Sequence, residues 1–210
     1  MQETRTFDLD AGVDSLAFAN TLDGRLDPQT REQLQHYDDL VAFAHQASLL
    51  DEPEASGLRA MAMANPAAAQ GVLKQAIALR ETIYRIFSAV AAGRAPENRD
   101  LAALNHDLCV AMAHSRLVPG PDGIEWDWQR DPLRLDRVLW PVVRSAAELL
   151  TSGEEGRVRE CAAHDCGWLF LDESRNRTRR WCSMQSCGNR AKVDRFRARR
   201  RGAEIIETDE

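Results

Sequence analysis

Four cysteines near the end of the chain repeat one spacing. Cys161 and Cys166 form one C-x4-C pair, Cys182 and Cys187 form a second, and fifteen residues separate the pairs. Thiolates carried on two short loops are typical of a tetrahedral zinc site, and four of them leave no open position for water or substrate. We therefore predict one structural Zn²⁺ ion that is held by all four cysteines and that gives shape rather than chemistry.

Two other roles for these cysteines are open. His164 lies inside the first pair and could replace one thiolate, which would give three sulfurs and one imidazole. Two disulfides are the other alternative, and the expected compartment argues against them. No segment resembles a cleavable signal, and the longest uncharged run, residues 60–73, is too short to span a bilayer. We expect a soluble, cytoplasmic protein without membrane contact, where disulfides are rare.

The fifth cysteine, Cys109, lies in an apolar helical pattern and is expected to be a small core residue.

Charge divides the chain into unlike parts. The formal net charge is −6, but residues 157–202 carry +8, residues 1–156 carry −10 and residues 203–210 carry −4. A basic segment beside an acidic one suggests that the basic part binds a polyanion. Hydrophobic residues make up 44% of the sequence, which is enough for a globular core.

Most of the acidic region has helical patterning. Asp27-Pro28 is a typical helix start, and apolar residues then recur at helical spacing as far as Leu50. Asn65-Pro66 predicts the start of a longer helix that ends near Gly93. Another helix is expected over residues 97–114.

The pattern changes between residues 115 and 131. Ile124, Trp126 and Trp128 alternate with charged or polar residues after a turn rich in proline and glycine, and this predicts one β-hairpin. Asp131-Pro132 is expected to open a last helix, which Pro141 kinks or divides into two.

The predicted fold is mainly α. A multihelical domain with one β-hairpin occupies residues 1–152, and a polar linker separates it from a small four-cysteine zinc finger at residues 157–202. Residues 203–210 form an acidic tail. In the finger we expect a strand at residues 168–171, its return partner at residues 179–181, and a helix from about residue 188 to 200. This order of elements resembles a treble clef.

One segment of the acidic domain departs from core patterning. Asn20 and Thr21 interrupt an apolar helix, so their side chains either cap the neighbouring backbone or face a ligand. The first role is the simpler one. The second would make Asn20, Thr21 and Arg25 a small-molecule pocket.

The finger contains most of the candidate nucleic-acid contacts. Arginine suits both phosphates and guanine edges, and a metal-held frame lowers the cost of ordering several of them. The candidates are Arg175, Arg177, Arg179, Arg180, Arg190, Lys192, Arg195, Arg197 and Arg199.

Helical geometry splits the second half of this set into two rows. Arg190 and Arg197 lie on one side of the predicted helix, and Lys192, Arg195 and Arg199 lie on nearly the opposite side. The two rows cannot face one groove equally. One of them is therefore expected to be structural, or the basic face docks on the acidic domain.

From residue 161 to 201 the chain resembles the CGNR zinc finger, named for the residues that stand here at 187–190. The segment from Phe18 to Arg25 is similar to the N-terminal F-x-N-T motif of the ABATE domain, which usually precedes that finger. The resemblance implies zinc at the four cysteines and DNA binding in bacterial transcription control, within a stress response. The matched finger segments are Trp168-Leu169-Phe170-Leu171-Asp172, Ser174-Arg175-Asn176 and Arg179-Arg180-Trp181-Cys182-Ser183-Met184.

We therefore expect a DNA-binding transcription regulator whose helical domain senses a small-molecule effector or forms a homodimer. The alternative is a finger that binds protein or RNA without reading DNA sequence. An enzyme is not expected, because the sequence does not supply the paired base and nucleophile that catalysis needs.

Overall fold

Helices make up most of the chain in the computed structural model, which describes residues 5–121, 123–130 and 132–197. The helices are α1 (Asp14–Ala19), α2 (Tyr37–Gln46), α3 (Glu52–Ala64), α4 (Pro66–Ala91), α5 (Asn98–Met112), α6 (Trp140–Thr151) and a last one at residues 189–197, with short turns η1 (Leu135–Leu139), η2 (Glu155–Arg157) and η3 (Met184–Gly188). The strands pair as three antiparallel hairpins, β1 (Leu22–Asp23) with β2 (Arg31–Glu32), β3 (Ser115–Gly120) with β4 (Gly123–Trp128), and β5 (Val158–Glu160) with β6 (Leu169–Leu171). The predicted mainly α fold is confirmed.

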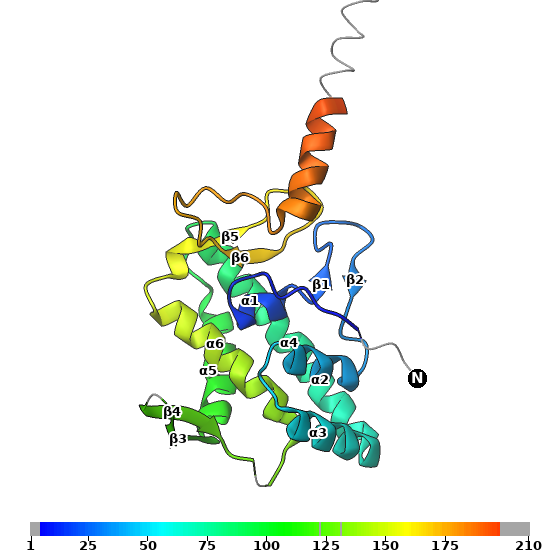
Figure 1. The fold of residues 1–210 in the computed structure, drawn as a ribbon, viewed down its shortest axis with the longest axis vertical. Helices are drawn as coiled ribbons and strands as arrows, with labels where there is room; N and C mark the ends of the chain where they lie inside the picture. The colour runs from blue at the N-terminus through cyan, green and yellow to red at the C-terminus, as the bar shows by residue number, and fades with distance from the viewer. Residues whose placement is uncertain (1–4, 122, 131, 198–210) are drawn as a thin grey trace, which may run out of the picture.

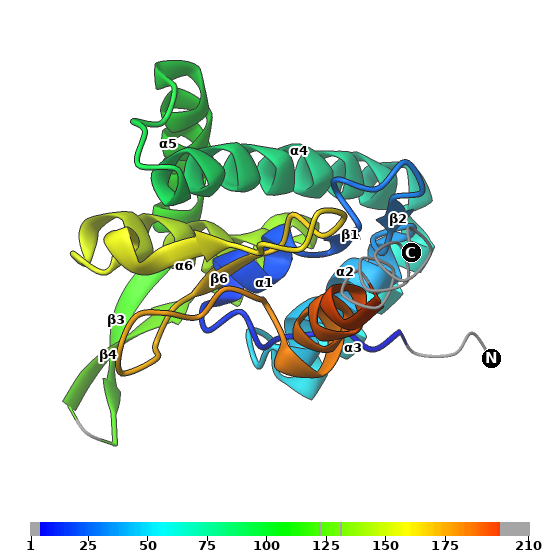
Figure 2. The same ribbon diagram turned by 90° about the horizontal axis from the view of Figure 1, so that it is seen from above.

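Helix α4 is the centre of the acidic domain. It begins as the sequence predicts, because Pro66 opens the first turn and the Asn65 side chain accepts a hydrogen bond from the Ala68 N–H at 3.1 Å. Its buried side includes Leu73, Ile83 and Phe87. Helix α1 contacts both α4 and α6, and Figure 2 shows α1 and α6 on the same side of α4. No helix in the described part of the chain is both long and apolar enough to cross a membrane.

The Asp27-Pro28 prediction is wrong. No helix begins there; the pair lies in the turn that joins β1 to β2, and α2 begins only at Tyr37. The Asp27 carboxylate accepts from the Gln29 N–H at 2.7 Å, which is the local bond that a turn and a helix cap have in common. The Asp-Pro pattern therefore correctly predicted a hydrogen bond from the Asp27 side chain to the nearby backbone, but this bond stabilises a turn and not a helix start.

The Cys109 prediction is also wrong, because this side chain is exposed on α5. Leu104 and Ala111 are the buried apolar residues of that helix instead.

The second half of the domain follows its predicted pattern. Strands β3 and β4 pair from Ser115↔Trp128 to Gly120↔Gly123. Pro141 lies in the first turn of α6, so the expected division into two shorter helices occurs as η1 followed by α6. The predicted helix start at Asp131-Pro132 is wrong, because Pro132 lies in a bend and the first helical turn, η1, begins only at Leu135. Asp131 itself lies outside the described residues.

The finger shares the core of the acidic domain. Val158, Leu169 and Leu171 of β5 and β6 are buried in the same apolar cluster as α1 and α4. Glu160 at the end of β5 accepts a hydrogen bond from the Ser88 hydroxyl of α4 at 2.8 Å. The helix at residues 189–197 extends away from this body, as Figure 1 shows at the top of the view. The boundary between residues 152 and 157 stays a prediction.

Candidate metal centre and nucleic-acid surface

The four predicted cysteines come together in a single cluster. All are buried, and their sulfurs lie within 4.8 Å of one another. The Cys166 and Cys182 sulfurs are 3.7 Å apart, and those of Cys182 and Cys187 are 3.6 Å apart. A tetrahedron with zinc–sulfur bonds of about 2.3 Å places its sulfurs about 3.8 Å apart. The cluster therefore fits one zinc ion, with no place among the four sulfurs for His164.

The ionisation of the cysteines also points to a cation. Hydrogen bonds from Cys166 and Cys182 lower the pKa of Cys161, which favours its thiolate form. Hydrogen bonding with Cys161, together with burial, raises the pKa values of Cys166 and Cys182. Since thiolates repel one another, a metal is needed to keep all four deprotonated. The four cysteines can coordinate one structural zinc ion.

Local backbone geometry places the first cysteine pair. Strand β5 leads into Cys161, whose N–H donates to the Trp168 carbonyl at 2.8 Å, so the chain turns back at once into β6. Gly167 makes the turn at φ +70°, and a Cβ there would lie 3.0 Å from the Arg25 Cβ. The Cys166 carbonyl accepts from the Arg25 N–H at 3.0 Å. The acidic domain thus supports the first metal loop directly.

The second pair lies on the turn that opens the last helix. Cys182 donates its N–H to the Cys161 sulfur at 3.4 Å, and Cys187 lies within the π-helical turn η3. A Cβ on Gly188 would lie 2.8 Å from the Met184 sulfur, so the flexible Met184 side chain would have to move to admit one. The helix that follows is the predicted one, and its described part ends at residue 197.

The predicted return strand at residues 179–181 is wrong. The partner of β6 is β5, with Phe170 opposite Arg159. The other edge of β6 has no room for a strand either. The Leu171 N–H donates to the Ala11 carbonyl at 2.8 Å, and the Asn20 side chain donates to the Leu169 carbonyl. Residues 179–181 instead lie beside the first metal loop, where the Arg180 carbonyl accepts from the Ala162 N–H at 2.9 Å.

Asp172 organises the arginine-rich loop that follows β6, a role that sequence reasoning missed. Its Oδ1 accepts from the Ser174 N–H at 3.0 Å and the Ser174 hydroxyl at 2.6 Å, and its Oδ2 accepts from the Arg179 N–H at 3.1 Å. Burial alone would raise the pKa of Asp172, but these hydrogen bonds outweigh it and lower the pKa. The sequence signal was an aspartate two residues before a serine, directly after an apolar strand.

Two of the nine predicted nucleic-acid residues, Arg179 and Arg190, use their side chains for contacts within the finger. The Arg179 guanidinium lies 4.4 Å from the Phe170 ring centroid and donates to the carbonyls of Trp181 and Cys182. Arg190 pairs with Asp165 at 2.8 Å and donates to the Cys187 sulfur at 3.2 Å. These contacts hold the metal loops together and engage both guanidinium groups within the finger.

The remaining described candidates are exposed and have no carboxylate partner among the described residues. Arg195 uses only its Nε, which donates to the Ala191 carbonyl of its own helix. Arg180 lies over the Trp181 ring at 5.1 Å. Arg199 lies outside the described residues. The exposed set is Arg175, Arg177, Arg180, Lys192, Arg195 and Arg197.

The alternative that this basic face docks on the acidic domain has little support in the described residues. Their ion pairs that involve finger arginines are Arg157 with Glu154 and Arg190 with Asp165, and both are local to the finger and its linker. The helix that carries Lys192 and Arg197 extends away from the acidic domain (Figure 1).

The predicted pocket residues have protein partners. Thr21 donates to the Phe18 carbonyl at 2.8 Å, which is the local capping role. Asn20 instead makes two hydrogen bonds to Leu169 in β6, a role that neither prediction covered. Arg25 pairs with Glu81 at 2.7 Å and lies 3.9 Å from the Tyr84 ring centroid. The structure supports a structural role for all three, and an effector pocket at these residues stays an untested prediction.

A helical domain whose core includes the strands of a four-thiolate finger defines a two-part metalloprotein. The chain belongs to the ABATE family, described as "Putative stress-induced transcription regulator", whose model matches residues 14–153. The CGNR zinc finger model matches residues 157–200. The resemblance stated from the sequence is confirmed in both parts. A comparison with curated proteins found no match.

Proposed function

We propose that this chain is a DNA-binding transcription regulator whose zinc finger contacts phosphates. One observation carries the proposal: six exposed cationic side chains lie on a metal-held loop and helix without a carboxylate partner among the described residues. The family description adds regulation and a stress response. The helical domain would then sense an effector or form a homodimer.

The difference between paired and unpaired charged groups in the finger supports phosphate binding. Three of the five finger carboxylates are already engaged, Glu160 by Ser88, Asp165 by Arg190 and Asp172 by the loop backbone. The six exposed cations outnumber the two remaining carboxylates, Glu173 and Asp194, so the surface keeps a positive excess that attracts mobile anions. A polyanion that replaces those ions gains the entropy of their release. The buried thiolate cluster keeps the loop and helix in place before a partner arrives, which lowers the ordering cost of binding.

The test is the salt dependence of binding to duplex DNA by zinc-loaded protein. Fluorescence anisotropy of a labelled duplex between about 50 and 200 mM salt should give a linear log–log plot with a slope of roughly −0.9 per phosphate contact. Replacing Arg195 and Arg197 together by alanine should weaken binding to every sequence and make the slope shallower by up to about 1.8, which is two contacts.

The matched control removes the same charge from the helical domain, at the exposed Lys74 and Arg94. This control variant should keep the wild-type slope. Absence of binding at low salt would contradict the proposal, and so would an equal change of slope in both variants. Selection of bound genomic fragments would then identify a preferred sequence.

A second candidate is a finger that binds protein or RNA. It is favoured by the side chains of Val193 and Phe196, which are 46% and 61% exposed on the projecting helix. Competition between duplex DNA and a structured RNA for the same protein separates this candidate from the first. Neither function assigns a catalytic step to the chain.

A further inference from the structure

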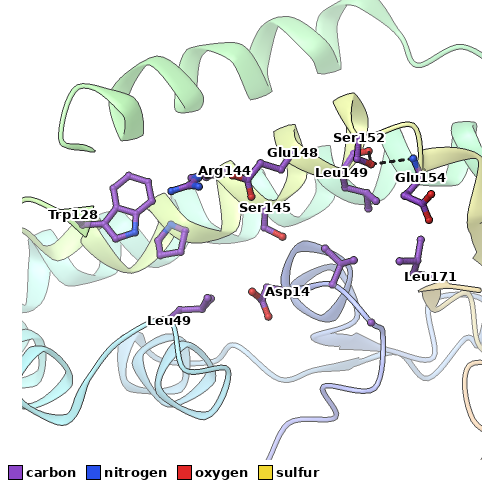
Figure 3. Close-up of a pocket in the computed structure, with 13 residues that line it drawn as sticks. Asp14, Leu49, Trp128, Arg144, Ser145, Glu148, Leu149, Ser152, Glu154 and Leu171 are labelled. Carbon is purple, nitrogen blue, oxygen red and sulfur yellow. Dashed lines mark hydrogen bonds and ion pairs between the residues drawn. The ribbon is translucent and has the colours of Figure 1, made fainter. Parts of the chain in front are cut away.

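A groove of about 550 Å³ lies where the acidic domain meets the finger. Figure 3 shows α6 on one side and the start of α1 on the other, with Leu171 of β6 at one end and Trp128 of β4 at the other. The volume is in the range of small-molecule sites. Its apolar lining consists of Val13, Leu49, Trp128, Pro141, Leu149 and Leu171.

Most charged groups in the groove are already paired. Arg144 donates to Glu148 at 2.6 Å, one helical turn further along α6. Glu154 pairs with Arg157 of the linker. In each pair the arginine neutralises the carboxylate, so neither Glu148 nor Glu154 needs a cation from a ligand.

Asp14 is the exception. Its carboxylate has no hydrogen-bond or ion-pair partner among the described residues, and it faces the same space as the Ser145 hydroxyl in Figure 3. Burial raises the pKa of Asp14, since no cation compensates for the water that it has lost. The Ser145 oxygen accepts from the Ser15 N–H at 3.1 Å, and its proton has no acceptor among the described residues.

A partly buried, unpaired carboxylate above an apolar floor favours one kind of ligand. A cation would restore the electrostatic balance, and a single charge is enough because Asp14 alone is unpaired. The aliphatic side chains and the Trp128 ring would hold an apolar body. We propose that this groove binds a small organic monocation, namely an amine with an apolar body, whose ammonium pairs with Asp14.

Such a ligand would touch both parts of the protein at once. Asp14 and Ser145 belong to the acidic domain, whereas Leu171 belongs to the strand that follows the first pair of metal ligands. The site is distinct from the one expected at Asn20, Thr21 and Arg25. It does not depend on nucleic-acid binding, and its test uses no nucleic acid, so the two proposals can fail separately.

The test compares three probes of similar shape on the full zinc-loaded chain, namely 2-phenylethylamine, 2-phenylethanol and phenylacetate. Isothermal titration calorimetry should show the amine binding about tenfold or more tightly than the alcohol, since a charge-assisted hydrogen bond is worth that factor. Phenylacetate should bind least. NMR shifts on adding the amine should centre on the Trp128 indole and the backbone of Leu171.

Two variants locate the charge that matters. Asp14→Asn should reduce the affinity for the amine to that for the alcohol. The matched control is Asp107→Asn on α5, because burial raises the pKa of that carboxylate too and it lies away from the groove. This control should keep the wild-type preference for the amine.

Three results would overturn the proposal. They are equal binding of amine and alcohol by the wild-type chain, an unchanged preference in a folded Asp14→Asn variant, and NMR shifts centred outside the groove. The first and third use the unaltered protein, so they decide the matter even where a variant fails to fold.

Discussion

The side-chain amide of Asn20 pairs with the backbone of Leu169 in both directions. Its Nδ2 donates to the Leu169 carbonyl at 2.8 Å, and its Oδ1 accepts from the Leu169 N–H at 2.9 Å. Asn20 caps the end of α1, and Leu169 opens β6 beside the first metal loop. A buried side chain thus supplies the pairing that a neighbouring strand would give.

Replacing Asn20 by aspartate should destabilise the protein by about 2–3 kcal/mol, because a carboxylate cannot donate to the Leu169 carbonyl and its charge is buried. Urea unfolding with zinc present measures the loss. The matched control is Asn65→Asp, since aspartate keeps the acceptor that caps α4. An equal loss in both variants would show that the Leu169 pairing has no special weight.

Removing the metal should lower the melting temperature of the helices as well as unfold the finger. The reason is that Val158, Leu169 and Leu171 lie in the common core. Circular dichroism during a thermal scan with and without a chelator measures the shift. Helical signal that melts at the same temperature in both scans would show that the finger is thermodynamically separate.

Zinc content checks the ligand set directly. The wild-type chain should hold one zinc ion, and serine at Cys161 or Cys187 should abolish tight binding, because four thiolates complete the tetrahedron. Serine at the exposed Cys109 should leave the content unchanged. Zinc bound at full stoichiometry by the Cys187 variant would contradict the four-thiolate site.

Arg177 and Arg179 should respond oppositely to alanine substitution. Arg179→Ala removes donors to two finger carbonyls and the contact with Phe170, so we expect a loss of stability of about 1–3 kcal/mol. Arg177→Ala should leave stability nearly unchanged and make the salt slope of DNA binding shallower by about 0.9. Unfolding curves and anisotropy on both variants check this. A stability loss confined to Arg177→Ala would reverse the assignment.

The Glu81 ion pairs give a pH-dependent contribution to stability. Burial would raise the pKa of Glu81, but its hydrogen bonds and charge pairs with Arg25 and Arg80 outweigh this and lower it. A carboxylate with a lowered pKa contributes fully above its unfolded value of about 4.3, and the contribution is lost as the pH falls through the folded value. The stability difference between wild type and Glu81→Gln should therefore be constant from pH 8 to about 5 and shrink below about 4.

Because acid also releases zinc from both proteins, only this difference is informative. Urea unfolding across the pH series measures it. A difference that grows towards low pH would contradict the ion pairs.

Local signals predicted the parts of the fold that local bonds decide. Helix α4, its Asn65 cap and the β3–β4 hairpin follow from patterns within a few residues. The cysteine spacing likewise predicts the metal ligands, because each thiolate pair lies on one short loop.

Contacts between residues far apart in the sequence determine the features that local patterns did not predict. The pattern of residues 179–181 suits a strand, but β5 and the pair of Ala11 and Asn20 already occupy both edges of β6. The nine basic candidates look alike in sequence, and only the structure separates Arg179 and Arg190 from the others by their contacts with Phe170 and Asp165.

The contact between α1 and β6 joins residues about 150 positions apart, and it has a consequence for synthesis. A ribosome completes α1 long before Leu169 exists, so the core lacks Val158, Leu169 and Leu171 until the last quarter of the chain is made. The nascent acidic domain must therefore wait with apolar surface uncovered until the metal loops arrive. Folding of the finger depends on zinc at this stage, because its four thiolates hold the loops that carry these strands.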